Sequence, residues 1–343
     1  MTAEAKHRAD TVKENLGEFG GSMTQKDISE KFGFPQSSIS ETVKMLRNEG
    51  AVTVTGQTPD DLSEDPMESI EALLKRQERA ERLASLKKDQ VVAIDSEKPV
   101  GVTLFSDIHW GATGLDVKAL VADTKMVRDA EGMYAFCLGD LTDNWIGKLA
   151  GIAGEQSISI PQEKAAAEWW LEQLSGKMPV VVAGNHDNRT ITQSHIDYVH
   201  EMLRGSQLLY GKDEVRFTLN VGDGVWKWKC RHLFKGNSQW NETHAAEKDG
   251  KMRDIWDFAA SGHYHKPTII RPFYNEMRDK LCYACNIGTY KGEDDYATML
   301  GYRHHKTEYT ATIIYFPDGR AHIAQGATLE ESCRYLKYLR KSY

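Results

Sequence analysis

The chain has 343 residues, enough for one large domain and a smaller one, each with its own core. Its formal net charge of −7 excludes a basic field over the whole molecule, although a local basic patch stays compatible with it. The first residues are polar and no run of about eighteen apolar residues follows, so we expect a cytoplasmic protein without a membrane span.

Residues 1–56 are predicted to form a small, separate domain that is mostly helical. Thr24 followed by Asp27 is close to a capping box, which indicates the start of a helix. The segment GFP at residues 33–35 ends that helix, and apolar spacing predicts a second one over residues 36–50. Two short helices across a tight turn indicate a helix-turn-helix.

A short strand and a polar helix face would complete a winged helix-turn-helix. AVTVTG at residues 51–56 predicts the strand. The exposed face of the second helix is expected to carry Ser37, Ser38, Ser40, Thr42 and Lys44. Such side chains can contact phosphates or base edges. Because acidic and basic residues nearly balance in this domain, two alternatives stay open: contact with nucleic acid, which we favour, and contact with protein or dimerisation.

Residues 57–97 are predicted to connect two domains. QTPDDLSED at residues 57–65 is acidic and rich in turn-forming residues, which is typical of a linker. Residues 66–88 follow as a charged helix with one narrow apolar stripe. The helix is therefore either a solvated connector or the seam of a homo-oligomer.

A different pattern begins at residue 98 and continues to residue 343. Short, β-rich apolar runs end in polar motifs: VGVTLF before SDIH, MYAFC before LGDLTD, and PVVV before AGNHD. Helical stretches near residues 116–130 and 161–175 separate these runs, which is the order of elements in an α/β fold. Because chemistry gathers at the carboxyl ends of the strands in such sheets, we expect the polar motifs to lie together.

Seven residues near these strand ends are candidate metal ligands. They are Asp107, His109, Asp140, Asn185, His232, His263 and His265. Carboxylate, imidazole and amide oxygen donors suit borderline divalent ions such as manganese, iron or zinc. Seven donors exceed the need of one ion, whereas two ions with one bridging carboxylate would use them all. The alternatives to His232 are His195, His200 and His244.

The segment SGHYHKP, residues 261–267, sets two histidines two positions apart. In an extended strand, alternation would place both imidazoles on one side. The glycine before them and the proline after them predict that the strand ends here in a turn. We therefore expect two metal-binding rings side by side at the edge of a sheet.

Taken in order, the motifs resemble the signature of the calcineurin-like metallophosphoesterase superfamily over about residues 98–320. The motifs stand as DIH at 107–109, GDLTD at 139–143, GNHD at 184–187, His232 and GHYH at 262–265. The resemblance implies an α/β fold in which two sheets form a sandwich flanked by helices. Phage-type members with a helix-turn-helix extension have a similar arrangement, which would place the protein in the cytoplasm of a host cell.

The resemblance also implies how the ligands divide between two divalent ions. The first ion would be held by Asp107, His109 and His265, and the second by Asn185, His232 and His263. Asp140 would bridge them. Manganese is the first expectation for both ions, with iron, zinc or nickel as alternatives.

Three further residues are expected to serve the reaction itself. His186 corresponds to the catalytic histidine of the superfamily, aimed at the scissile phosphate or the leaving oxygen. Asp143 is expected to orient groups around the metal ligands, and Asp187 to orient His186. The expected reaction is in-line attack of a metal-bound hydroxide on phosphorus, with His186 protonating or stabilising the leaving alkoxide.

The departures from the superfamily bear on the substrate. Protein phosphatases of the superfamily have arginine where Asn144 stands and prefer glutamate where Asp187 stands, so a protein-phosphatase activity is disfavoured. Arg189 is expected either to reach a phosphate or to form a surface salt bridge. We expect a nuclease-like phosphodiesterase. The alternatives are a phosphomonoesterase or cyclic-nucleotide phosphodiesterase and, from another class, a DNA-binding regulator with a silent metal domain.

Overall fold

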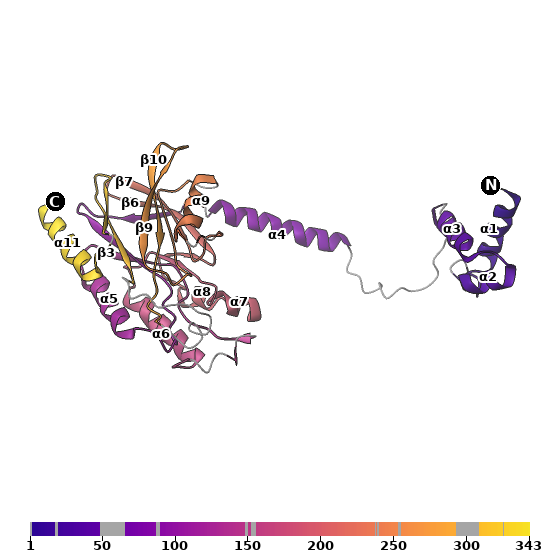
Figure 1. Ribbon diagram of the computed structural model, residues 1–343, viewed down its shortest axis with the longest axis horizontal. Helices are drawn as coiled ribbons and strands as arrows, with labels where there is room; N and C mark the ends of the chain where they lie inside the picture. The colour runs from indigo at the N-terminus through magenta and orange to yellow at the C-terminus, as the bar shows by residue number, and fades with distance from the viewer. Residues whose placement is uncertain are drawn as a thin grey trace. The chain divides into compact units, whose positions relative to one another are not determined.

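A computed structural model describes residues 2–17, 20–48, 66–86, 90–147, 150–151, 156–236, 238, 240–252, 255–292, 309–324 and 326–343. The chain divides into two compact units, Met1–Arg79 and Ala80–Tyr343, whose elements are labelled in Figure 1. The predicted strand at 51–56 and the predicted linker at 57–65 lie outside the described residues.

The first unit begins with three short helices: α1 (Ala3–Asn15), α2 (Gln25–Phe32) and α3 (Gln36–Asn48). Thr24 and Asp27 form the predicted capping box of α2, and Gly33 ends that helix with φ 74°. The helices share one apolar core, made of Ala9, Val12, Leu16, Ile28, Ile39, Val43 and Leu46. The two helices predicted across the GFP turn are therefore present.

The exposed face of α3 differs from the prediction at two positions. Ser37, Ser40 and Lys44 are exposed, whereas Ser38 is half-buried and Thr42 is buried. The Thr42 hydroxyl donates to a backbone carbonyl one turn earlier and accepts from Arg8 Nε, both at 2.8 Å. Thr42 therefore joins α1 to α3 instead of facing solvent, because an arginine 34 positions earlier reaches it.

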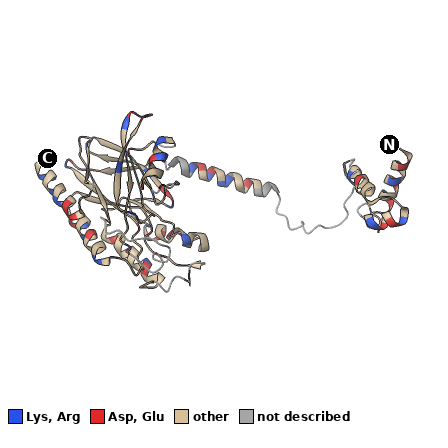
Figure 2. Cartoon of the chain, in the orientation of Figure 1, with Lys and Arg blue, Asp and Glu red and all other residues tan. Residues whose placement is uncertain are grey.

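Helix α4 (Pro66–Leu86) lies within the charged helix predicted for residues 66–88. Basic and acidic side chains follow one another along it (Figure 2). Ile70, Leu73 and Leu74 of its apolar stripe are exposed. The homo-oligomer through this helix stays a prediction. Among the described residues, no helix combines the length and the apolar character that crossing a bilayer requires.

The second unit contains two six-stranded sheets. The first has the order β12 (Ala321–Ala324), β11 (Ala311–Tyr315), β2 (Val100–Phe105), β3 (Met133–Cys137), β4 (Val180–Val182) and β5 (Leu209–Gly211). Strands β2, β3, β4 and β5 run parallel to one another, and β11 runs antiparallel to β2. The three predicted apolar runs are β2, β3 and β4, side by side.

The second sheet has the order β1 (Val91–Ile94), β6 (Glu214–Val221), β7 (Gly224–Arg231), β8 (Phe258–Ser261), β10 (Lys280–Asn286) and β9 (Ile269–Asn275). β8 runs parallel to both β7 and β10. Each sheet therefore has neighbouring parallel strands whose carboxyl ends lie at a common edge.

The sheets pack face to face, and helices cover their outer faces (Figure 1). Val102 and Leu104 of β2 lie in the core between the sheets, and Phe105 lies in the outer core with helices. The helices of that outer core are α5 (Val117–Asp129), α6 (Ile160–Gln173), α8 (Tyr198–Met202) and α11 (Leu329–Ser342). Helix α9 (His244–Met252) packs on the second sheet, and α7 (Asn188–Ser194) follows the GNHD motif. The predicted fold class, α/β with two sheets flanked by helices, is confirmed.

Candidate metal centre

The seven candidate ligands follow the carboxyl ends of five strands. In the first sheet, β2 precedes Asp107 and His109, β3 precedes Asp140, and β4 precedes Asn185. In the second sheet, β7 precedes His232, and β8 precedes His263 and His265. Because β2, β3 and β4 are parallel neighbours, as are β7 and β8, each set of loops leaves its sheet at one edge.

Five ligands have a left-handed backbone conformation. Their φ angles are 51° at Asp107, 52° at His109, 52° at Asp140, 75° at His263 and 49° at His265. Aspartate, asparagine and histidine tolerate this region better than most residues, but it still costs conformational free energy. β8 ends at Ser261, so the alternation of an extended strand does not apply to GHYH. The two imidazoles enter different groups of candidate ligands, His265 the first and His263 the second.

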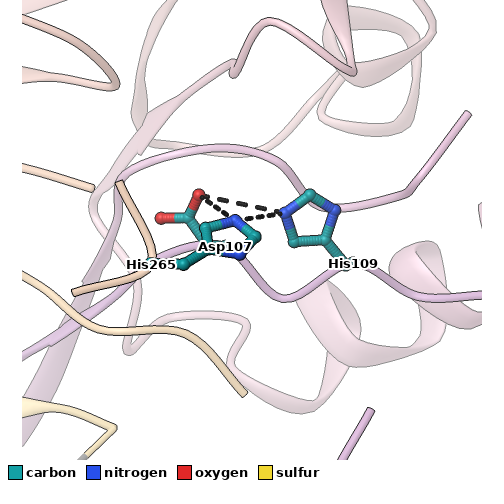
Figure 3. Close-up of side chains that lie close together, drawn as sticks. All are labelled: Asp107, His109 and His265. Atoms are coloured by element: carbon teal, nitrogen blue, oxygen red, sulfur yellow. Dashed lines mark hydrogen bonds and ion pairs between the residues drawn. The ribbon is translucent and has the colours of Figure 1, made fainter. Parts of the chain in front are cut away.

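The first group consists of Asp107, His109 and His265, and it is drawn in Figure 3. The Nε2 atoms of His109 and His265 are 3.0 Å apart. They lie 3.9 Å and 3.3 Å, respectively, from Oδ1 of Asp107. Asp107 and His109 are fully buried. Three ligand-type atoms from two sheets therefore converge on one point.

The second group consists of Asn185, His232 and His263. His263 Nδ1 lies 2.7 Å from Asn185 Oδ1 and 3.2 Å from His232 Nε2. His232 Nε2 in turn lies 3.1 Å from Asn185 Oδ1. Of His232 and its three alternatives, His195, His200 and His244, His232 is the one that lies in the cluster.

The carboxylate of Asp140 lies between the two groups. Its Oδ2 is 3.8 Å from His109 Nε2 and 3.1 Å from His232 Nε2. Its Oδ1 accepts a hydrogen bond of 2.8 Å from the backbone N–H of His186. Asp140 can therefore serve both groups at once.

Hydrogen bonds on the far side of two rings fix which nitrogen faces the cluster. His232 Nδ1 lies 2.8 Å from the carbonyl oxygen of Leu138, and His109 Nδ1 lies 2.7 Å from Asp143 Oδ1. Oxygens of these kinds accept hydrogen bonds, so each Nδ1 carries a proton and Nε2 is left to bind a cation. In both groups, histidine nitrogens and side-chain oxygens converge on one point, which is the arrangement of ligands that a metal ion binds.

The pKa values show how strongly the cluster attracts positive charge. Burial would lower the pKa of His232, but Asp140 and Asp107 outweigh it and raise the pKa to about 10. Burial would also lower the pKa of His109, but hydrogen bonds with Asp107 and Asp143 outweigh it and raise this pKa to about 9. Burial also opposes ionisation of Asp107, yet the nearby imidazoles hold the pKa of this carboxyl well below its usual range. The cluster is a pocket that favours cations.

Two motif glycines allow the ligand loops to approach one another. A Cβ on Gly184 would overlap the carboxylate and backbone nitrogen of Asp140, and one on Gly262 would overlap Ser106 and the carboxylate of Asp107. A side chain at either position would push a ligand out of the cluster. The glycine before each motif is therefore a packing requirement of the site.

His186 stands beside the ligands with one ring nitrogen directed toward them. Its Nδ1 lies 2.7 Å from the backbone carbonyl oxygen of Asp143, so Nδ1 carries the proton of the neutral ring. Its Nε2 lies 3.9 Å from Asp140 Oδ2. Burial lowers the pKa of His186 to about 3, although the charge of Asp140 opposes this shift. Asp143 therefore holds both His109, through its carboxylate, and His186, through its backbone.

Asp187 lies in a different place from the one expected. Its carboxylate accepts hydrogen bonds from the backbone of Gly184 at 2.9 Å and Leu141 at 3.2 Å, and from the Tyr198 hydroxyl at 2.6 Å. These donors and the backbone N–H of Thr142, at 3.4 Å, are its hydrogen-bond partners among the described residues, and the ring of His186 is not one of them. The expectation that Asp187 orients His186 is not what the geometry shows, because the chain turns at GNHD and directs the carboxylate toward the GDLTD loop.

Two buried charged residues around the site were missed from the sequence. Lys291 follows β10, and its Nζ lies 3.3 Å from Asp143 Oδ1. Glu163 of α6 accepts a hydrogen bond of 3.0 Å from the backbone of Asn144 and another from Gln156. Neither residue lies in a ligand motif. No pattern in the sequence singles out either residue.

Asp143→Asn is expected to weaken metal binding. The substitution removes the carboxylate that fixes the His109 ring, and losing such a partner typically costs about 10- to 100-fold in metal affinity. Titration of the protein with Mn²⁺ in a calorimeter measures the effect. Asp223→Asn, at an exposed position, is the matched control. An affinity within about twofold of wild type would contradict the role of Asp143.

Glu163→Gln is expected to stabilise the protein at pH 8 and to have no effect near pH 5. Burial raises the pKa of Glu163 to about 7, so the folded state binds its proton more tightly than the unfolded state does. Stability from this group is therefore lost as pH rises from about 4.5 to 7. The gain at pH 8 is on the order of 2 kcal/mol, measured by urea unfolding. A gain that is the same at both pH values, or also found in the surface variant Glu97→Gln, would contradict this assignment.

Comparison with known proteins gives one family model and a set of solved structures. The model of a family described as a domain of unknown function, DUF7343, matches residues 6–56. No curated protein matches the sequence of this chain. The chain is 13% identical to the solved structure of a single mutant of Vps29 from Entamoeba histolytica, with a TM-score of 0.37 over 65% of this chain and 97% of that chain.

Two further solved structures are similar over comparable lengths. Vps29 from Chaetomium thermophilum is 12% identical, with a TM-score of 0.34 over 65% of this chain and 95% of that chain. The calcineurin-like phosphoesterase YfkN from Bacillus subtilis is 10% identical, with a TM-score of 0.33 over 71% and 100%. At such TM-scores these structures do not indicate a function for this chain, and the evidence for its function lies in the site itself.

Proposed function

We propose that this protein is a hydrolase of phosphodiester bonds that uses two divalent metal ions and acts on nucleic acid. The observation that carries the proposal is the convergence of ligands from five strand ends on two adjoining groups, with Asp140 between them. The order of the motifs, which resembles that of calcineurin-like metallophosphoesterases, supports the same conclusion.

The donor set suits manganese first, with iron, zinc or nickel as alternatives, because it mixes imidazole, carboxylate and amide oxygen. Asp107, His109 and His265 would hold one ion, Asn185, His232 and His263 the other, and Asp140 both. The chemistry that such a pair supplies when bound is activation of water and neutralisation of charge on a phosphoryl group.

His186 is the residue that we propose to act on the leaving oxygen. Its Nδ1 proton is held by the Asp143 carbonyl, so Nε2 is the atom that can exchange a proton with the substrate. An anionic phosphate beside the ring would raise its pKa, because a nearby negative charge favours the imidazolium. His186 would then donate from Nε2 as the ester bond breaks.

The first unit is the proposed holder of the polymeric substrate. Ser37, Ser40 and Lys44 are exposed on α3, the second helix of the helix-turn-helix. Hydroxyl and ammonium groups on such a helix can bind the phosphates or base edges of a duplex. A nucleic acid held in this way explains why a phosphodiesterase domain would carry this unit.

His186→Ala is expected to reduce hydrolysis of bis-p-nitrophenyl phosphate by about 10²- to 10⁴-fold in kcat while manganese content stays unchanged. Wild-type activity should disappear in EDTA. His200→Ala, at an exposed position, is the matched control and should behave as wild type. A wild-type protein that is inactive with manganese, iron, zinc and nickel on diesters and monoesters alike would overturn the enzymatic proposal.

The double variant Ser40→Glu/Lys44→Glu is expected to cleave DNA poorly and bis-p-nitrophenyl phosphate normally. Both substitutions place negative charge on the exposed face of α3, which would repel phosphates. Cleavage rates on single- and double-stranded DNA, RNA and cyclic nucleotides measure the difference. If the double variant cleaves every polymer as wild type does, the first unit does not hold the substrate.

A further inference from the structure

A cation is held against His186 on the side of the metal centre. Arg189 lies in the first turn of α7, and its guanidinium contacts the ring of His186, which precedes the helix. Its guanidinium lies 4.5 Å from the ring centroid of Trp145, and its Nη1 donates to the carbonyl oxygen of Asp143 at 2.9 Å. Trp145 is buried, so it is a firm support for the guanidinium.

The guanidinium of Arg189 lies against both nitrogens of the His186 ring. Its Nη1 is 3.0 Å from Nδ1, the ring atom that donates to the carbonyl oxygen of Asp143. Its Nη2 is 3.1 Å from Nε2. The same Nε2 lies 3.9 Å from Asp140 Oδ2, the carboxylate between the two ligand groups. Arg189 is thus one hydrogen bond away from the atom that faces the metal centre.

We propose that Arg189 is a phosphate-binding residue of this site, whose guanidinium contacts non-bridging oxygens of the phosphate group beside the metal centre. This inference rests on the proposed function and adds a specific substrate contact to it. A guanidinium is always charged, and its planar set of N–H donors matches two phosphate oxygens. Because Trp145 and the Asp143 carbonyl fix its position, little side-chain entropy is lost on binding.

Lys291 has a different task in the same neighbourhood. Its Nζ is 3.3 Å from Asp143 Oδ1 and 5.7 Å from the Trp145 ring, and the residue is only 7% exposed. Lys291 therefore offsets the charge of Asp143, which would otherwise repel an anion. Arg189 is the cation that lies against His186. A phosphate that reacts with Nε2 of His186 must bind beside this cation.

Two variants separate charge from packing at this position. Arg189→Met keeps a long, flexible side chain over Trp145 but removes the charge, and Arg189→Lys keeps the charge but loses the planar donor set. Arg189→Gln is a second neutral variant that retains polar character, in case the methionine variant does not fold. Arg204→Met is the control, because Arg204 is exposed and pairs with Glu201 on the surface.

The test measures binding of inorganic phosphate to the full-length protein in the presence of manganese, by calorimetry. Arg189→Met and Arg189→Gln are expected to weaken phosphate binding by about 10- to 100-fold, and Arg189→Lys by less. Manganese content and melting temperature should match wild type. Phosphate affinity within about twofold of wild type in a folded neutral variant overturns the inference, as does wild-type protein that binds no phosphate.

Kinetics separate this inference from the proposed function. With bis-p-nitrophenyl phosphate, the neutral variants should raise KM more than they lower kcat. If wild type hydrolyses the diester and the neutral variants leave phosphate affinity and KM unchanged, Arg189 has no such role and the proposed function stands. If wild type hydrolyses no ester but phosphate binding depends on Arg189, the proposed function falls and the anion contact stands.

Discussion

The second unit buries two carboxylates, Asp107 and Asp140, around the same two imidazoles, those of His109 and His232. Such a pair is unfavourable unless positive charge is supplied nearby. The surrounding imidazoles, whose pKa values are raised at His109 and His232, show how strong this demand is. A cluster that favours cations at a fixed point is what the proposed metal-dependent hydrolase would require, and the rest of the domain holds this cluster together.

The two-sheet core provides the fixed frame, and buried polar residues join the frame to the loops. Parallel strands in each sheet bring their carboxyl ends to one edge, which sets the ligands within reach of one another. Asp187 ties the turn after β4 to the loop after β3. Glu163 holds the backbone at Asn144 from α6, and Lys291 reaches Asp143 from the end of β10. Each ligand loop is therefore fixed from a second direction.

The sequence predicted the fold class and the strands that lead to the site, because apolar runs followed by polar motifs are local features. Other features depend on contacts between distant segments and could not be predicted in this way. Thr42 is buried because Arg8 reaches it, and Asp187 points away from His186 because Tyr198 and the GDLTD backbone bind it. The turn at GHYH was expected, but its left-handed backbone was not, since hydrogen bonds from that backbone to Asp107 shape it.

The left-handed backbone at the ligands has a consequence for how the centre tolerates change. Alanine disfavours positive φ, so replacing Asp107 or His263 by alanine removes a donor atom and also penalises the turn that carries it. Asparagine accepts the same backbone geometry while lacking the carboxylate charge. A variant that carries asparagine at these turns would therefore keep the loop geometry while the donor set of the proposed metal centre changes.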